Sequence, residues 1–239
     1  MRIVLHVAGK DLDDALIFNR LRADLKKLCA SHQVIVVHNA DAQFQTELRR
    51  RGLADQTQPE HRALYETVLV QLNKTIVAKL SEELLPAIAM TGNHLGLIQA
   101  EPIPREEGHF PFTKIVRINA SILERQISGG SIPVVAPLAM DKSDTIQPVR
   151  SEHVAAKVAS ALKADLLIFL LEPNGYMENG KPVSTLHPGG SNIDSETGKI
   201  ASQASQSLKE GTKRAFLTKL GSMEKLIFEG ITVPTEILT

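Results

Sequence analysis

Short apolar runs recur along the chain and alternate with longer segments in which apolar residues return every three or four positions. The short runs are rich in β-branched residues and predict strands over residues 3–8, 34–38, 87–90, 114–118, 133–136, 166–171 and 214–218. Several of these runs are apolar throughout, which is typical of strands that are buried on both faces of a parallel sheet.

The longer segments predict helices over residues 14–31, 64–80, 121–128, 152–163 and 199–209. Residues 101–111 and 172–195 are rich in Pro, Gly, Asn or Ser and predict loops or hairpins. Strands that alternate with helices indicate crossover connections. The pattern therefore predicts an α/β fold, a three-layer α/β/α sandwich around a mainly parallel central sheet. We see no internal repeat and no linker, so we expect a single domain over residues 1–239.

Composition narrows the function classes. Lys plus Arg equals Asp plus Glu, at 27 each, so bulk charge gives no reason to expect binding to nucleic acid or to an anionic membrane surface. Cys29 is the single cysteine, which excludes an intrachain disulfide and fits a reducing, cytoplasmic location. No apolar stretch approaches the roughly 20 residues of a membrane-spanning helix.

Several common chemistries have no support in the sequence. The histidines show no metal-ligand spacing with carboxylates or with the cysteine, so we predict no metal site within the protein itself. The chain has no Gly-x-Ser-x-Gly elbow, no Gly-x-Gly-x-x-Gly dinucleotide turn and no Walker-type loop.

Six segments, taken in order, resemble the amino-acid kinase family and together cover nearly the whole chain. They are the first strand with its turn at Gly9 and Lys10, the second strand with the turn at Asn39, the helix with Asn73, and residues 132–137, 152–175 and 228–237. The layout is most similar to that of the N-acetylglutamate kinases. The resemblance implies the same three-layer fold, known for carbamate kinase, and a reaction in which ATP with Mg²⁺ phosphorylates a small carboxylate to an acyl phosphate.

The resemblance also implies an organisation. Residues 1–140 would form the half that binds the acid substrate and dimerises, and residues 141–239 the half that binds nucleotide. We expect a homodimer or higher homo-oligomer, with residues 64–80 as a possible contact surface, although packing on the sheet explains the same apolar stripe. The chain has no long N-terminal extension of the sort linked to feedback inhibition in some relatives, so we expect no such control.

Phosphoryl transfer needs positioning and cations more than covalent help from the protein. By resemblance, Lys199 opens a helix and contacts the transferring phosphoryl, and Glu152 stands where an aspartate orients the family's lysines. His6 occupies a family lysine position, and a neutral imidazole cannot replace a permanent charge. Lys10 could substitute in part. The alternative is that Lys199 and Lys10 are solvated surface lysines.

The phosphate-binding turns differ from the family pattern. Gly9 remains from the first turn and would let a phosphate approach the backbone. Asn39 begins the second turn, where Asp41 adds a negative charge that would repel phosphate. On the nucleotide side, Glu172 replaces an aspartate and Gly175 is retained.

Two residues are candidates for the acid substrate. Asn73 lies on the signature helix, and Arg150 replaces an asparagine that touches substrate in the family. Arg150 could bind a carboxylate in bidentate fashion, or it could simply pair with Glu152 at the surface. The substrate-binding arginine of the family has no clear match and should fall near residues 54–56.

Two alternatives to phosphorylation of N-acetylglutamate remain open. The altered glycine turns favour a catalytically impaired homologue that serves as a ligand-binding or regulatory subunit. The change at Arg150 favours a kinase that acts on a different small acid.

Overall fold

The computed structural model describes residues 1–53, 61–102, 112–171, 175–178, 180–188, 195–223, 225–229 and 235–239. Within these residues the central sheet has the strand order β12-β14-β13-β9-β1-β2-β6-β3. The bounds are β1 Arg2–Val7, β2 Gln33–His38, β3 Ala87–Thr91, β6 Ile132–Ala136, β9 Leu166–Leu170, β12 Thr185–Leu186, β13 Arg214–Thr218 and β14 Thr235–Ile237. Among the described pairs, β13 with β14 is antiparallel and the others are parallel, which confirms the predicted mainly parallel sheet.

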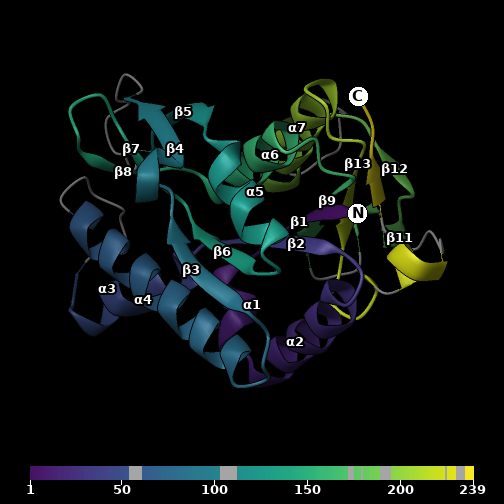
Figure 1. Ribbon diagram of the computed structural model, residues 1–239, viewed down its shortest axis with the longest axis horizontal. Coiled ribbons are helices and arrows are strands. Elements are labelled where there is room, and N and C mark those ends of the chain that lie inside the picture. Colours follow the sequence, from purple (N-terminus) through teal and green to yellow (C-terminus); the bar gives the residue numbers. More distant parts are fainter. Residues whose placement is uncertain are drawn as a thin grey trace.

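Helices cover both faces of this sheet, as Figure 1 shows. One face packs against α1 Gly9–Asp13, α2 Ala15–Cys29, α3 Asp41–Arg50 and α4 Arg62–Ser81, and the other against α5 Ala120–Ser128, α6 Ser151–Ala161 and α7 Ser195–Lys209. In β1, Ile3 and Leu5 point into the first layer and Val4 into the second. Burial on both faces is the reason for the uninterrupted apolar runs.

Residues at the two ends of α2 explain where this helix begins and ends. Asp14 caps α2, because its carboxylate accepts hydrogen bonds from the amides of Leu16 and Ile17 at 2.8 and 3.1 Å. Lys26 and Lys27 lie in the last turn of this helix, where positive charge complements the helix dipole.

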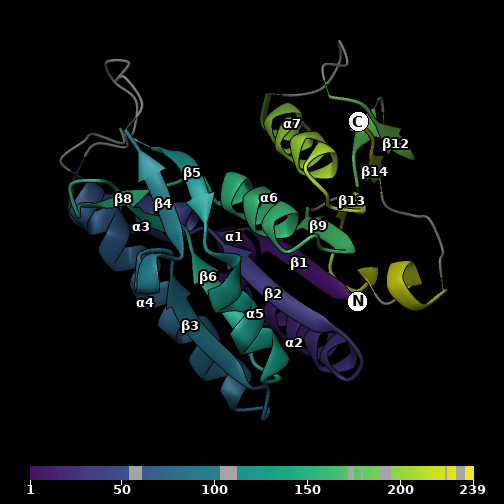
Figure 2. The same cartoon turned by 45° about the horizontal axis from the view of Figure 1, so that its top comes forward.

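A second sheet has the order β5-β4-β7-β8, and its strand β5 lies beside α6 (Figure 2). Its strands are β4 Ile98–Glu101, β5 Lys114–Ile118, β7 Leu138–Met140 and β8 Ile146–Pro148. The strand predicted over residues 114–118 therefore belongs to this sheet and not to the central one. The other three strands, α1 and α3 were not predicted, because these elements are short or carry many polar residues.

The predicted loop or hairpin over residues 172–195 contains a small hairpin, formed by β10 Met177–Glu178 and β11 Lys181–Pro182. Two further segments complete the described secondary structure, η2 His94–Gly96 and η3 Lys225–Glu229. In the described part of the chain, none of the helices combines the length and the apolar character needed to cross a bilayer.

Candidate functional site

A cavity of about 590 Å³ opens where α6 and α7 begin. These two helices pack side by side in both views (Figures 1 and 2). The cavity is lined by Asp41, Arg150, Glu152, His153, Glu196, Lys199, Ile200, Ser202 and Gln203. Asp41 follows the end of β2, and Glu152 approaches His6 near the end of β1. Ligands of open parallel sheets bind beyond the carboxyl ends of the strands, so this cavity is the candidate site.

The cavity unites three of the predicted residues, Arg150, Glu152 and Lys199. Lys199 does not open its helix as predicted, because α7 begins at Ser195 and Lys199 lies one turn further along. Glu196 occupies the first turn, where a carboxylate suits the helix dipole. The sequence prediction overlooked Glu196 and Gln203 as lining residues, although both share a helical face with Lys199.

The lining carries more negative than positive charge. The cations of Arg150 and Lys199 face the carboxylates of Asp41, Glu152 and Glu196. A triphosphate would therefore depend on its own Mg²⁺ for much of its charge compensation. Among the described residues, no group of three or more His, Cys, Asp or Glu side chains is arranged to hold a metal ion.

The Arg150 guanidinium stacks 4.7 Å from the ring centroid of Phe112. Stacking on an aromatic face restrains the planar guanidinium and leaves its edge available for a bidentate partner. The alternative was an ion pair between Arg150 and Glu152 at the surface. The ion pairs of the described residues do not include it.

Asp41 begins α3 and is held by a hydrogen bond from the Tyr65 hydroxyl to its Oδ1 at 3.0 Å. Burial raises the pKa of Asp41, and the neighbouring carboxylate of Glu152 acts in the same direction.

His6 is buried at the end of β1, with Nε2 2.8 Å from the Ser151 hydroxyl and 3.8 Å from Glu152 Oε1. Burial lowers the pKa of His6, although the Glu152 carboxylate opposes this shift. His6 is therefore neutral near pH 7 and does not supply the positive charge of the lysine that the family carries at this position. Lys10 does not replace it, because its side chain is exposed on α1 and lies outside the cavity lining.

The turn at Gly9 is occupied by side chains of the protein. The Gly9 amide donates to Asn39 Oδ1 at 2.6 Å, and Gln43 Nε2 donates to the Gly9 carbonyl at 2.7 Å. A Cβ placed on Gly9 would lie 2.5 Å from Gln43 Oε1, so glycine is required here by close approach. In this structure the groups that approach Gly9 are amide side chains of the protein, and the predicted approach of a phosphate stays a prediction.

Asn73 lies away from the cavity lining and is 2 % exposed. Its Nδ2 donates to His38 Nε2 and to the Val134 carbonyl, both at 2.9 Å. His38 Nδ1 lies 3.2 Å from the Asn39 carbonyl. A neutral His38 that carries its proton on Nδ1 satisfies both contacts, and burial lowers its pKa to about 4. Both hydrogen bonds are made to protein groups, which indicates a structural role, and the predicted contact of Asn73 with substrate stays a prediction.

Gly175 also lies outside the cavity lining. Gly175 has φ +76°, and a Cβ there would lie 2.7 Å from Thr235 Oγ1, so this glycine permits close packing against β14. Glu172 and the expected arginine region, residues 54–56, lie outside the described residues. Of the nearby arginines, Arg51 pairs with Glu47 and Arg62 donates to Gln147.

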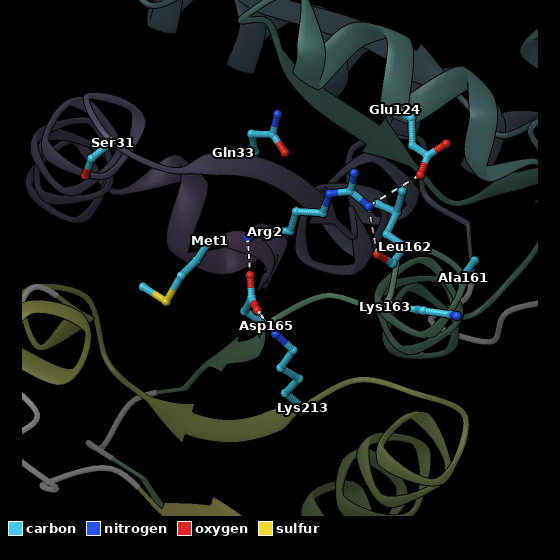
Figure 3. Close-up of a pocket in the computed structure, with 10 residues that line it drawn as sticks. All are labelled: Met1, Arg2, Ser31, Gln33, Glu124, Ala161, Leu162, Lys163, Asp165 and Lys213. Atoms are coloured by element: carbon cyan, nitrogen blue, oxygen red, sulfur yellow. Dashed lines mark hydrogen bonds and ion pairs between the residues drawn. The ribbon is translucent and has the colours of Figure 1, made fainter.

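A second cavity, of about 770 Å³, lies at the opposite ends of the strands (Figure 3). Its polar groups already bind one another. The Asp165 carboxylate accepts from the Arg2 amide at 2.7 Å and from Lys213 Nζ at 2.6 Å, and the Arg2 guanidinium donates to the Leu162 carbonyl at 3.1 Å. This cavity is larger but sits at the amino ends of the strands, where parallel sheets do not usually bind ligands.

Comparison with known proteins places this geometry in context. A sequence model of the amino acid kinase family matches residues 1–207. The acetylglutamate kinase of Nostoc punctiforme is 29% identical over 195 residues, which span 78% of this chain and 65% of the relative. The acetylglutamate kinase of Campylobacter curvus is also 29% identical over 195 residues, spanning 77% of this chain and 69% of the relative. The match to the Nostoc protein thus covers slightly less than two thirds of its length.

Solved structures show the same fold at low sequence identity. N-acetylglutamate synthase from Neisseria gonorrhoeae, complexed with coenzyme A and N-acetyl-glutamate, aligns with a TM-score of 0.84 at 20% identity, over 100% of this chain and 59% of that chain. The carbamate kinase of Giardia aligns with a TM-score of 0.72 at 12% identity, over 100% of this chain and 98% of that chain. These likenesses confirm the predicted fold.

Proposed function

Since the chain belongs to the amino acid kinase family, we propose that it transfers a phosphoryl group from Mg-ATP to the carboxylate of a small acid such as N-acetylglutamate. The observation that carries the proposal is the shared cavity at the carboxyl ends of β1 and β2, which holds both Arg150 and Lys199. The two similar proteins from Nostoc and Campylobacter, both acetylglutamate kinases, support the choice of acid.

Each cation has a separate task in this proposal. Arg150, restrained by stacking on Phe112, binds the carboxylate of the acid through two parallel hydrogen bonds. Lys199 stabilises the negative charge of the transferring phosphoryl group, and Glu152 orients the cations around it. The division predicted from the sequence is kept in the proposal, with residues 1–140 forming most of the acid side and residues 141–239 the nucleotide side, except that Arg150 of the second half reaches the acid. We include a homodimer or higher homo-oligomer in the proposal, to be checked by analytical ultracentrifugation.

The proposal is tested by calorimetric titration of Mg-ATP into the wild-type protein, Lys199→Ala and Lys209→Ala. Lys209 is the matched control, because it lies on the same helix and lines a different cavity. We expect micromolar binding that weakens at least tenfold in Lys199→Ala and is unchanged in Lys209→Ala. ADP release would then be measured with N-acetylglutamate and a panel of other small acids. Absence of binding up to millimolar Mg-ATP would refute the proposal.

A second candidate function is favoured by the occupied turn at Gly9 together with the neutral His6. In that case the protein binds a small acid in the same cavity and does not transfer phosphate, as a ligand-binding or regulatory subunit would. Thermal stabilisation by N-acetylglutamate, without any response to Mg-ATP, would support this candidate over the kinase.

A further inference from the structure

A third cavity, of about 400 Å³, lies between β5, α6 and α7. The helix α6 packs against both of the other elements (Figure 2). This lysine cavity is lined by Lys114, Ile115, His153, Lys157, Pro188, Ser202, Gln203, Ser205, Gln206 and Lys209. We propose that the lysine cavity binds a small phosphate ester, at a site separate from the candidate kinase site.

The two sites adjoin but differ in the groups that they present. They share His153, Ser202 and Gln203 as a common wall. The described residues that line the lysine cavity include three lysines and no carboxylate, whereas the candidate site holds three carboxylates. The charge of the lysine cavity therefore suits an anion that arrives without a metal ion.

The carboxylates that act on these lysines lie outside the lining. Glu210 accepts a hydrogen bond from Lys157 Nζ at 2.7 Å. Glu101, opposite Lys114 on β4, pairs with Lys142 at 2.6 Å. In the described part of the chain the ion pairs include neither Lys114 nor Lys209. These two ammonium groups are thus available to a ligand.

The shared wall carries the effect of this charge. Burial lowers the pKa of His153, and the positive charges of Lys157 and Lys114 act in the same direction, against the opposing effect of Glu210. The lysines therefore make the electrostatic potential at the cavity wall more positive. A bound anion would be stabilised by the same potential.

The lining also includes a buried hydroxyl without a partner. Ser205 is 2 % exposed, and its Oγ makes no hydrogen bond to any described residue. Ser202, Ser205 and Lys209 follow one another at helical spacing on α7, so Ser205 belongs to the face that lines the cavity. The buried Ser207 nearby donates to the Ala156 carbonyl at 2.8 Å. An unpaired buried hydroxyl costs free energy, and a ligand oxygen in the cavity would remove that cost.

The donor set favours a phosphate ester over a carboxylate. A phosphate group offers three acceptor oxygens and nearly two negative charges, whereas a carboxylate offers two oxygens and one charge. Lysines bind phosphate as point charges, and the serine hydroxyls and glutamine amides of the lining can donate to the remaining oxygens. Ile115 and Pro188 supply apolar surface for the carbon part of an ester.

The test is calorimetric titration of glycerol 3-phosphate and of inorganic phosphate, at constant ionic strength, into the wild type, Lys114→Gln and Ser205→Ala. Lys74→Gln is the matched control, because Lys74 is exposed on α4, on the opposite face of the central sheet. We expect glycerol 3-phosphate to bind at least threefold more weakly to Lys114→Gln and to Ser205→Ala than to the wild type. Lys74→Gln should match the wild type, and Lys199→Ala should retain the binding that Lys114→Gln loses.

Thermal unfolding separates loss of the site from damage to the fold. Without ligand, Ser205→Ala should unfold at the same temperature as the wild type or at a higher one, because its hydroxyl has no partner to lose. Glycerol 3-phosphate should raise the unfolding temperature of the wild type more than that of Ser205→Ala.

Three outcomes would overturn the inference: no binding of either ligand to the wild type, equal binding by every variant, or loss of binding in Lys199→Ala alone, which would place the phosphate in the candidate site. Tighter binding of glycerol 3-phosphate than of inorganic phosphate supports an ester as the ligand, and the reverse order overturns that choice in favour of free phosphate. Failure of the kinase proposal leaves this inference standing, since the two depend on different side chains.

Discussion

Replacing Asn73 with alanine separates a structural role for this residue from a role in substrate binding. Asn73 donates two hydrogen bonds of 2.9 Å from α4 into the sheet, one to His38 Nε2 on β2 and one to the Val134 carbonyl on β6. Alanine would leave both acceptors buried without this donor. Each unsatisfied buried group costs about 1–3 kcal/mol, so for the two acceptors we expect Asn73→Ala to lower the free energy of unfolding by roughly 2–6 kcal/mol.

The assay is urea denaturation followed by circular dichroism, with Asn19→Ala as the control. Asn19 is exposed on α2, so its replacement gives the same gain in helix propensity without loss of a buried hydrogen bond. We expect Asn19→Ala to change the free energy of unfolding by no more than about 0.5 kcal/mol. The reasoning is refuted if Asn73→Ala is as stable as Asn19→Ala and instead loses affinity for the acid ligand, because that result would identify a substrate contact.

Three further predictions follow from burial and packing. Lowering the pH from 6.5 to about 4 should reduce the free energy of unfolding by up to about 3 kcal/mol more in wild type than in His38→Gln. The reason is that His38 takes up a proton readily in the unfolded state but not in the folded state. If urea denaturation gave the same dependence of the free energy of unfolding on pH for both proteins, the prediction would be contradicted. Gly9→Ala should lower the free energy of unfolding by about 1–3 kcal/mol, because the new Cβ would lie too close to the Asn39 backbone carbonyl and to the Gln43 side chain. Gly129→Ala is the control: its Cβ would make only 3.4 Å contacts, so we expect no change in urea denaturation. Cys29 should react with a thiol reagent at pH 8 many times more slowly in the folded protein than in urea, because burial raises its pKa to about 11; equal rates would show that the thiol is accessible.

The sheet and its helical layers were predictable because they depend on patterns repeated over many residues. Runs such as residues 3–7 and 166–170 are apolar at every position except His6, and only a strand buried on both faces uses such a run fully. The helices with strong apolar periodicity were found within a few residues of their ends. The helix α3 was missed because its first turn reads as an altered glycine loop, and only Phe44 and Leu48 are buried in it.

The candidate site was predictable in part. The resemblance to the family's motifs selected Arg150, Glu152 and Lys199, which the fold brings to one cavity. Polarity on a helix does not reveal the direction of a side chain, and only the structure shows that the Asn73 amide points into the core toward His38. The charge state of His6 also depends on burial, which a sequence does not display.

The sequence by itself determined the fold class and the family of this protein, because the first follows from hydrophobic periodicity and the second from the order of motifs along the chain. Only the tertiary structure decided the order of the strands, the place of β5 in the second sheet and the groups that fill the turn at Gly9. Asn39 is 30 residues away from Gly9 in the chain, and their hydrogen bond exists because β1 and β2 run parallel and end at the same edge of the sheet. Hydrogen bonding and burial depend on distances between such remote residues, and these distances are set by packing.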